Sequence, residues 1–317
     1  MTLNALYGPL APEGPQPELV QTYRIANESG EGRVTIETVF PGVELCYNDM
    51  HLAWCNQEQS AAQNTIEINH CRVGRYECSF GENSCCYLAA GDFAVSAGTR
   101  KKSASCFPLR HYHGITILLD LDALVPETRQ LMAVFGIDLD AIRQYICTEN
   151  RCCILRDDPA VEHIFSELYA VRPPEKAGHR RLKVLELLLF LTELDSRAGT
   201  QQTAYFNCRQ VECAKQAAAR MTRDLRSRYT IEQLAQEAGL SPTALKACFK
   251  GVYGTSIYAY LREYRLQTAQ KLLAETDASV AEIAHQVGYE NPNKFSSAFR
   301  QMCGLTPTEY RKRCPIG

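Results

Sequence analysis

An internal repeat in the last third of the chain restricts its fold more than any other feature of the sequence. Residues 231–240 (IEQLAQEAGL) recur as residues 280–289 (VAEIAHQVGY), an offset of 49. From residue 245 onward the offset is 50, so a single insertion in a turn aligns the two copies. Self-similarity of this kind predicts two copies of one supersecondary unit.

Each copy has the residues that a helix-turn-helix needs. A small alanine lets the second helix approach the first, and a glycine four residues later can take the left-handed conformation that ends the first helix. A cap residue followed by proline then starts the second helix, whose apolar residues recur four apart and face the core. The paired positions are Ala235 and Ala284, Gly239 and Gly288, Ser241-Pro242 and Asn291-Pro292, Leu245-Phe249 and Phe295-Phe299.

Charge is unevenly distributed, although the formal net charge is only -2. Residues 1–216 carry 20 Lys and Arg against 27 Asp and Glu, whereas residues 217–317 carry 14 against 9. A basic C-terminal segment on an acidic body is typical of a nucleic-acid module attached to a domain that avoids nucleic acid. A chance division of charges is the alternative, because the basic excess is modest.

Residues from about Cys208 to Arg313 closely resemble the AraC/XylS family of bacterial transcription regulators, including the ending 304–311 (GLTPTEYR). The resemblance implies a seven-helix domain that inserts two recognition helices into successive major grooves of a double-stranded DNA operator. It also favours activation through contact with RNA polymerase. A rigid connecting helix, from about Ile257 to Glu275, can hold two readers about one DNA turn, ~34 Å, apart.

The resemblance also assigns DNA contacts, position by position. The recognition helices are expected at 242–251 and 292–302. The base-reading residues are Thr243, Ala244, Lys246 and Ala247 in the first and Asn293, Lys294, Ser296 and Ser297 in the second. The phosphate-binding residues, which position the protein without specifying sequence, are Lys250, Arg262, Arg265, Arg300 and Arg311. A solvated surface charge is the alternative for each basic residue.

Short apolar runs separated by turns between about Val34 and Leu119 predict a β-barrel or sandwich. The fold class is therefore α+β, with an N-terminal β-barrel or cupin-like sensor, a helical extension and an all-α C-terminal domain with two helix-turn-helix units. The expected organisation is a disordered arm at 1–20, the β sensor at 21–125, the helical extension at 126–197, a linker at 198–207 and the DNA-binding domain at 208–317.

A helix from about Glu175 to Asp195 carries an apolar stripe formed by Leu182, Leu185, Leu188 and Leu189. Such a stripe packs either into the core of its own domain or against a second copy of the chain in a homodimer.

Residues 68–77, 87–92 and 112–122 look like a cupin-type sensor, most similar to the PchR-like subgroup, some members of which respond to siderophores. A small-molecule effector is therefore expected, although its identity does not follow from the resemblance. Tyr47, Trp54 and His70 are candidates for lining its pocket, and ordinary core residues are the alternative.

The chain has 15 cysteines among its 317 residues, a high proportion. A cysteine-based metal or redox sensor is thus the alternative to an organic effector, although none of the cysteines has the C-x-x-C spacing of a closed zinc site. The pair His111-x-His113 is similar to the metal pair of enzymatic cupins but lacks the flanking glutamate and glycine. We therefore expect no metal, no cofactor and no enzymatic activity.

The sequence also has no apolar run of the ~18 residues that a membrane span needs. The N-terminus lacks a basic region followed by an apolar block, as a signal peptide would have. We expect a cytoplasmic protein without membrane contact.

Overall fold

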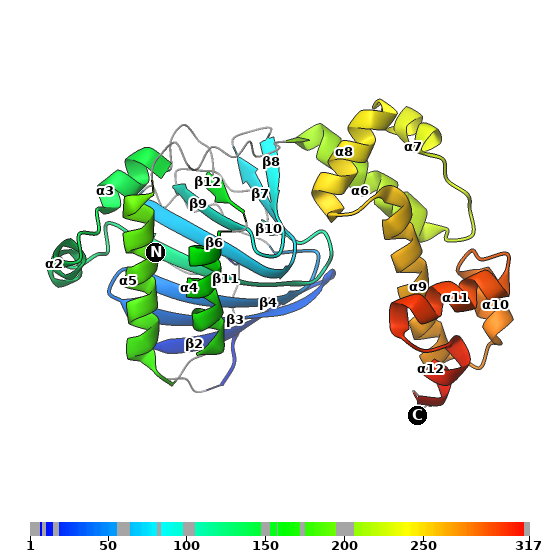
Figure 1. The fold of residues 1–317 in the computed structure, drawn as a ribbon, viewed down its shortest axis with the longest axis horizontal. Coiled ribbons are helices and arrows are strands. Elements are labelled where there is room, and N and C mark those ends of the chain that lie inside the picture. The colour runs from blue at the N-terminus through cyan, green and yellow to red at the C-terminus, as the bar shows by residue number, and fades with distance from the viewer. Residues whose placement is uncertain are drawn as a thin grey trace. The chain divides into compact units, whose positions relative to one another are not determined.

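A computed structural model of the chain describes residues 7, 11–14, 19–55, 64–80, 84–97, 105–146, 153–156, 158–171, 175–194 and 206–313. The chain divides into two compact units, Met1–Asn207 and Cys208–Gly317 (Figure 1). In the described part of the chain, none of the helices is long and apolar enough to cross a membrane.

The N-terminal unit is built on two antiparallel sheets. The larger sheet has the order β1-β2-β3-β4-β11-β6-β9-β12, and the smaller one the order β13-β8-β7-β10-β5. The strands of the larger sheet are β1 (Ala11–Pro12), β2 (Val20–Asn27), β3 (Gly30–Phe40), β4 (Val43–His51), β11 (Tyr112–Asp120), β6 (Thr65–Gly74), β9 (Phe93–Ala97) and β12 (Cys153–Leu155). Those of the smaller sheet are β13 (Phe206–Asn207), β8 (Ser84–Leu88), β7 (Tyr76–Phe80), β10 (Ser105–Cys106) and β5 (Trp54–Cys55).

The predicted barrel is not closed. Within the described residues, strand pairing does not join the two sheets or the two edges of the larger sheet. The strand-rich N-terminal domain is thus confirmed. Of the two predicted arrangements, the barrel is wrong, and two open sheets that pack face to face correspond to the sandwich.

Two further differences concern the predicted arm and linker. Ala11–Pro12 pairs with β2, and Tyr7 is buried, so the disordered arm expected at 1–20 is wrong for these residues. Phe206–Asn207, expected to be linker, pairs with β8. The rest of both segments is outside the described residues, apart from Glu13–Gly14 and Leu19–Val20.

The helical elements of the N-terminal unit include α2 (Pro126–Val134), α3 (Leu139–Ala141), the single π-helical turn η1 (Ile142–Ile146), α4 (Pro159–Ala170) and α5 (Ala177–Glu193). Two of them, α4 and α5, cover one face of the larger sheet. Figure 1 shows α4 and α5 lying in front of β2, β3, β4, β11 and β6. The segment expected to be a helical extension also contains the short strand β12.

The larger sheet buries a different set of side chains on each face. Ile115, Ile117 and Ile68 pack against the helices, together with Leu185 and Leu188 of α5. The alternate positions pack against the smaller sheet in a second core, which includes Cys46, Cys71, Cys78, Cys86 and Leu118. Alternation along each strand therefore produces three layers, namely helices, large sheet and small sheet.

A buried ion pair ties α5 to the sheet. Arg180 and Glu37 are 0% and 3% exposed, and Arg180 Nη2 donates to Glu37 Oε1 at 2.9 Å. Arg180 also donates through Nε to the same carboxylate and through Nη1 to the Glu175 carbonyl. In the predicted apolar stripe, Leu185 and Leu188 are buried in the core, whereas Leu182 is 61% exposed.

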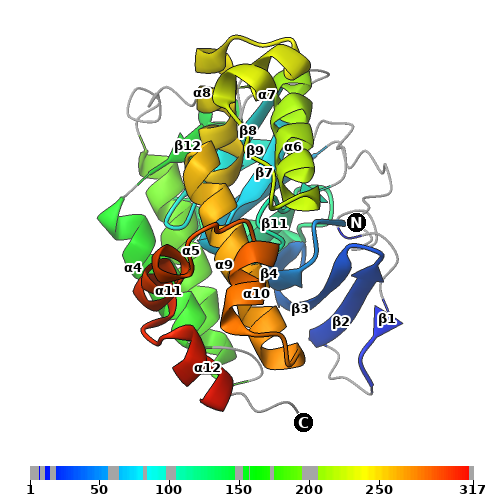
Figure 2. The ribbon, with the colours of Figure 1, turned by 90° about the vertical axis from the view of Figure 1, so that its right-hand side faces the viewer.

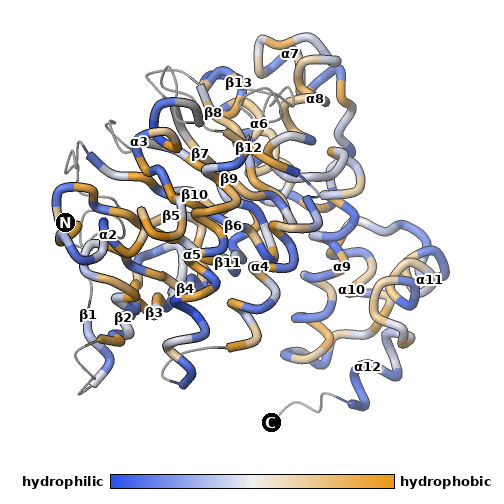
Figure 3. Tube along the Cα trace, turned by 60° about the vertical axis from the view of Figure 1, so that its left-hand side comes forward, coloured by the Kyte–Doolittle hydropathy of each residue, from blue (hydrophilic) through white to orange (hydrophobic). Residues whose placement is uncertain are grey.

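The described residues of the C-terminal unit form seven helices, as the resemblance implies. They are α6 (Cys208–Arg223), α7 (Ile231–Ala238), α8 (Pro242–Tyr253), α9 (Ile257–Glu275), α10 (Val280–Gln286), α11 (Pro292–Cys303) and α12 (Pro307–Arg313). Figures 1 and 2 show the α7–α8 pair and the α10–α11 pair at opposite ends of α9. The predicted bounds of the connecting helix match α9, and Figure 3 shows α12 as mostly hydrophilic.

Candidate nucleic-acid interface and ligand groove

Caps and one glycine shape the first helix pair. The Thr230 hydroxyl accepts a hydrogen bond from the Gln233 N–H, and the Gln233 side chain accepts one from the Thr230 N–H, both at 3.2 Å. Gly239 ends α7 with a φ of +63°, in the left-handed region. Ser241 Oγ then accepts from the Ala244 N–H at 3.2 Å and starts α8. The predicted roles of Gly239 and Ser241 are confirmed.

The second helix pair repeats this construction. Ser279 and Glu282 form the capping box of α10, and the hydrogen bonds from Ser279 lower the pKa of the Glu282 carboxyl. Gly288 has a φ of +83°, and a Cβ atom there would lie 2.0 Å from the Leu225 carbonyl oxygen. Asn291 Oδ1 accepts from two N–H groups of the first turn of α11, at 2.8 and 3.3 Å. Glycine is needed at 288 both for its conformation and for this close approach.

The four predicted base-reading residues of α8 lie on its outer side: Thr243, Lys246 and Ala247 are exposed, and Ala244 is half-buried. On the opposite side, Leu245 and Phe249 are fully buried. The helix therefore has one face that holds it in the domain and one that is available to a partner.

The second helix, α11, has the same division. Its predicted base-reading residues Asn293, Lys294 and Ser297 are exposed, and Ser296 is half-buried. Phe295 and Phe299 are fully buried and pack with Leu266 and Leu273 of α9. Contact of either outer face with bases stays a prediction.

The predicted phosphate-binding residues divide into two groups. Lys250, Arg262 and Arg300 are exposed, and Arg262 donates to the Gln301 side chain. Arg265 and Arg311 are half-buried and bind carbonyl groups of their own domain.

Arg265 donates to the Leu225 and Ser227 carbonyls, at 2.5 and 3.3 Å. Arg311 donates to the Ala278 and Leu273 carbonyls, at 2.5 and 3.4 Å. The structure thus gives these two residues a bracing role inside the domain, which their charge alone did not indicate.

The three candidate effector-binding residues, Tyr47, Trp54 and His70, do not lie together. Tyr47 and His70 lie on either side of Ile115 in the large sheet and point toward α4, where Tyr47 Oη donates to the Leu168 carbonyl at 3.1 Å. Trp54 lies on β5, in the other sheet. Tyr47 packs in the core, whereas His70 lines a ligand-sized space.

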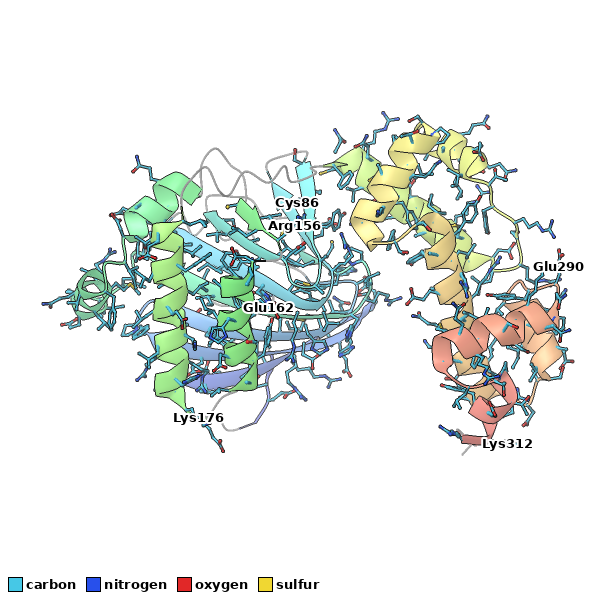
Figure 4. All side chains as sticks on the ribbon, viewed as in Figure 1. Cys86, Arg156, Glu162, Lys176, Glu290 and Lys312 are labelled. Atoms are coloured by element: carbon cyan, nitrogen blue, oxygen red, sulfur yellow. The ribbon has the colours of Figure 1, made fainter. Side chains whose placement is uncertain are left out.

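That space is a groove of about 430 Å³ between β6 and α4, within the size range of small-molecule sites. It is lined by His70, Arg72, Glu162, Ser166 and Tyr169 among others. Figure 4 shows Glu162 on α4. Sequence reasoning missed Arg72, Glu162 and Tyr169 as a group, because a strand and a helix about 90 residues apart supply them.

His70 is the most unusual group in the groove. Its ring stacks on Phe165 with centroids 4.2 Å apart, and burial, assisted by the Arg72 charge, lowers the pKa of His70 to about 4. Nδ1 lies 3.1 Å from Tyr169 Oη, whereas Nε2 is enclosed and has no hydrogen-bond partner among the described residues. The Glu162 carboxylate is 3.7 Å from Nε2, but its side chain is 65% exposed, so burial outweighs its attraction.

The space between the two sheets is much smaller. Its volume is about 20 Å³, room for about one water molecule, and its lining includes Tyr7, Asn48, Asn69, Tyr76 and Thr116. The Asn48 amide donates to Thr116 Oγ1, which donates in turn to Asn69 Oδ1. An effector inside the sandwich would have to displace side chains such as Tyr7.

The described cysteines are not joined to one another by disulfides. Burial raises the pKa of both Cys55 and Cys71 to about 12 and that of Cys46 further, so these thiols stay protonated. In the part of the chain that the structure describes, cysteines do not form a group of three or more metal ligands. Cys147, Cys152 and Cys314 are outside the described residues.

Comparison with known proteins concentrates on the segment that contains both helix pairs. A family model described as a helix-turn-helix domain matches residues 234–313. A putative AraC-like transcription regulator of Streptomyces lividans is 38% identical over 90 residues, which cover 28% of this chain and 30% of the relative. The transcriptional activator RhaR of Klebsiella pneumoniae is 31% identical over 119 residues, which cover 38% of this chain and 40% of that protein.

Some matches extend further along the chain. The virulence regulon transcriptional activator VirF of Yersinia enterocolitica is 27% identical over 236 residues, or 73% of this chain and 80% of VirF. Among solved structures, the DNA-binding domain of AdpA in complex with a target DNA is 28% identical, with a TM-score of 0.31, and covers 32% of this chain and 90% of that one.

The match to the Streptomyces relative spans less than a third of that protein's length. It falls on the residues from which the resemblance was predicted, and the relatives named are transcription regulators rather than enzymes. In its C-terminal segment, the chain is therefore similar to a helix-turn-helix family model and to AraC-like transcription regulators.

Proposed function

We propose that the chain is a sequence-specific DNA-binding transcription regulator whose N-terminal unit binds a small-molecule effector. The observation that carries the DNA-binding part is the repeated helix pair. At each end of α9, a capped helix buries one face in the domain and leaves short polar and basic side chains on the other.

The length of α9 supports two simultaneous contacts with one face of DNA. Its 19 residues span about 28 Å at 1.5 Å per residue, close to the ~34 Å between successive major grooves. Residues 208–317 carry 16 Lys and Arg against 10 Asp and Glu, which favours a polyanionic partner.

The two helices read DNA in different ways. On α8, Lys246 is the one long polar side chain among the four base-reading residues, so bases are recognised there by Lys246 and by methyl contacts from Thr243 or Ala247 to thymine. On α11, Asn293 and Lys294 supply donors and acceptors for base edges.

A salt-dependent titration of operator DNA tests this division of roles. Lys246→Ala should cost specific binding about 1–3 kcal/mol, whereas Arg300→Ala should weaken binding to all sequences and lower the salt slope by about one. Lys176→Gln, in the N-terminal unit, is the matched control for loss of a positive charge. If both C-terminal variants bound operator DNA as the unaltered chain does, the assigned DNA-contacting surface would be wrong.

For the effector, the groove at His70 has more support than the interior of the sandwich. Tyr169 Oη lies 3.1 Å from His70 Nδ1 and 3.4 Å from the His70 carbonyl oxygen, and when neutral His70 accepts at Nδ1 its proton is on Nε2, at the wall of the groove. Arg72, whose guanidinium lies 4.6 Å from the centre of the Tyr169 ring, adds a positive charge beside it. These groups fit a small organic anion, such as a carboxylate.

Calorimetric titration with a panel of small carboxylates tests the groove. Arg72→Gln should weaken binding of any ligand found, and Arg24→Gln, on the distant strand β2, should not. An effector must also bind the DNA-competent and DNA-incompetent states unequally, so operator affinity should change when it is added. A ligand that binds equally well to the Arg72 variant would place the effector site elsewhere.

The family also bears on what the regulator does at a promoter. RhaR and VirF are named transcriptional activators, which supports activation through RNA polymerase for this chain too. Homodimerisation through α5 has less support, because Leu185 and Leu188 are used inside the unit. A cysteine-based sensor likewise has less support, because the buried thiols are held protonated.

A further inference from the structure

Three histidines from separate stretches of chain meet at one end of the central strands of the larger sheet. His51 is the last residue of β4, His111 directly precedes β11, and His113 is its second residue. Their ring centroids lie 4.7 to 5.7 Å apart, and one nitrogen of each lies within 4.8 Å of the others. His51 Nδ1 and His111 Nδ1 are 3.3 Å apart.

A carboxylate belongs to the same cluster. Asp49 pairs with His113 across β4 and β11, and its Oδ1 lies 2.9 Å from His51 Nε2 and 3.3 Å from His113 Nδ1. This oxygen is enclosed yet lacks a well-directed hydrogen bond among the described residues. An enclosed carboxylate oxygen that touches two imidazoles is a setting that favours a cation.

We propose that His51, His111 and His113 form a binding site for a divalent transition-metal ion such as Zn²⁺, with Asp49 orienting the imidazoles. Three imidazole nitrogens suit Zn²⁺, Co²⁺, Ni²⁺ or Cu²⁺ and do not suit Mg²⁺ or Ca²⁺, which take oxygen ligands. Nitrogens 3.3 Å apart already have about the spacing that two ligands have at ~2.0–2.1 Å around a tetrahedral ion. A carboxylate on the second nitrogen of a ligating histidine is the usual way to fix its ring.

The neighbouring Arg110 does not place a competing positive charge in the cluster. The nearest arginine in sequence, Arg110, donates to the Ser29 carbonyl at 2.5 Å instead of entering the cluster. The cluster is partly exposed, with His51 exposed and the other two histidines half-buried, so an ion can enter from solvent without unfolding the sheet.

The ion would join segments that also form the wall of the interior space. Cys55 follows His51 by four residues, and Phe107 and Tyr112 flank His111, and all three line the space between the sheets. The Phe107 N–H donates to the Ala53 carbonyl at 2.7 Å, which already holds the two segments together. Metal binding therefore strengthens this end of the sandwich.

Titration with Co²⁺ followed by absorption tests the site. The full-length chain is used without a histidine tag and with its thiols reduced, because Co²⁺ reports its ligands through its spectrum. A site of imidazoles gives ligand-field bands, whereas thiolates add an intense charge-transfer band in the near ultraviolet. We expect one equivalent of Co²⁺ to bind with ligand-field bands alone.

Four variants locate the ion. His51→Gln, His111→Gln and His113→Gln should each weaken Co²⁺ binding by more than the 10–100-fold that loss of an orienting partner costs, and Asp49→Asn by about that amount. His163→Gln, an exposed histidine on α4, should bind as the unaltered chain does. Thermal unfolding without metal shows whether each variant folds.

Either of two results would overturn the proposal. Binding that is unchanged in all three histidine variants would mean that these side chains are only solvated neighbours. If the one equivalent of bound Co²⁺ instead gave an intense charge-transfer band, the ion would be bound by cysteine thiolates.

Discussion

At the scale of single residues, His70 shows how burial changes the chemistry of a side chain. Its ring is stacked on Phe165 beneath α4, and burial lowers its pKa to about 4. The folded protein therefore holds His70 neutral at pH 7, while an unfolded histidine titrates near 6.5.

This shift predicts a pH dependence of stability. As the pH falls, the unfolded state takes up a proton on His70 before the folded state does. The contribution of His70 to the free energy of unfolding is therefore complete above about pH 6.5 and falls progressively toward pH 4, by about 3 kcal/mol in all. In urea unfolding of the full chain, His70→Gln should lose less stability than the unaltered chain over this range. His163→Gln should not, since its side chain is exposed. Parallel pH profiles for His70→Gln and the unaltered chain would show that His70 is not desolvated.

At the scale of elements, the turns at Gly239 and Gly288 distinguish two reasons for glycine, namely a left-handed backbone conformation and the close approach of another backbone segment. Both have a positive φ, but an added Cβ meets the Leu225 carbonyl at 2.0 Å at 288 and nothing closer than 3.7 Å at 239. Gly239→Ala should cost about 1–2 kcal/mol of stability, the strain of the left-handed conformation alone. Gly288→Ala should cost clearly more in the same urea titration. Equal losses would mean that the loop after α6 moves away freely.

The Arg180–Glu37 pair fastens α5 to β3, and its removal should depend on both partners. Arg180→Met leaves a buried carboxylate alone and should cost about 3–5 kcal/mol of unfolding free energy. The double variant Arg180→Met with Glu37→Leu should be more stable than the sum of the two single losses, because neither charge is then left buried. Strict additivity in this double-mutant cycle would contradict a direct interaction.

Local elements were predictable where their signals are local. The caps, the turn glycines and the bounds of α9 follow from residues within one or two helical turns, so the C-terminal helices were predicted closely. The barrel was not, because closure depends on which edge strands pair across long sequence separations. The same reason hid the histidine cluster, where spacing shows His111 and His113 but only the pairing of β4 with β11 brings His51 beside them.

At the scale of the whole molecule, the near-zero net charge describes a chain of two unlike parts. The C-terminal unit has a basic excess of six, and the N-terminal unit has the acidic remainder together with the groove at His70 and the histidine cluster. This division is what a regulator needs if one part contacts DNA and the other responds to small molecules.

The central claim is that one chain reads DNA with two helices held apart by α9. Selection of binding sequences from a random double-stranded DNA library by the full-length chain tests it directly. We expect the enriched sequences to share two short blocks whose centres are about 10–10.5 base pairs apart, one for α8 and one for α11. A single block, or two blocks at variable spacing, would contradict a rigid two-helix reader.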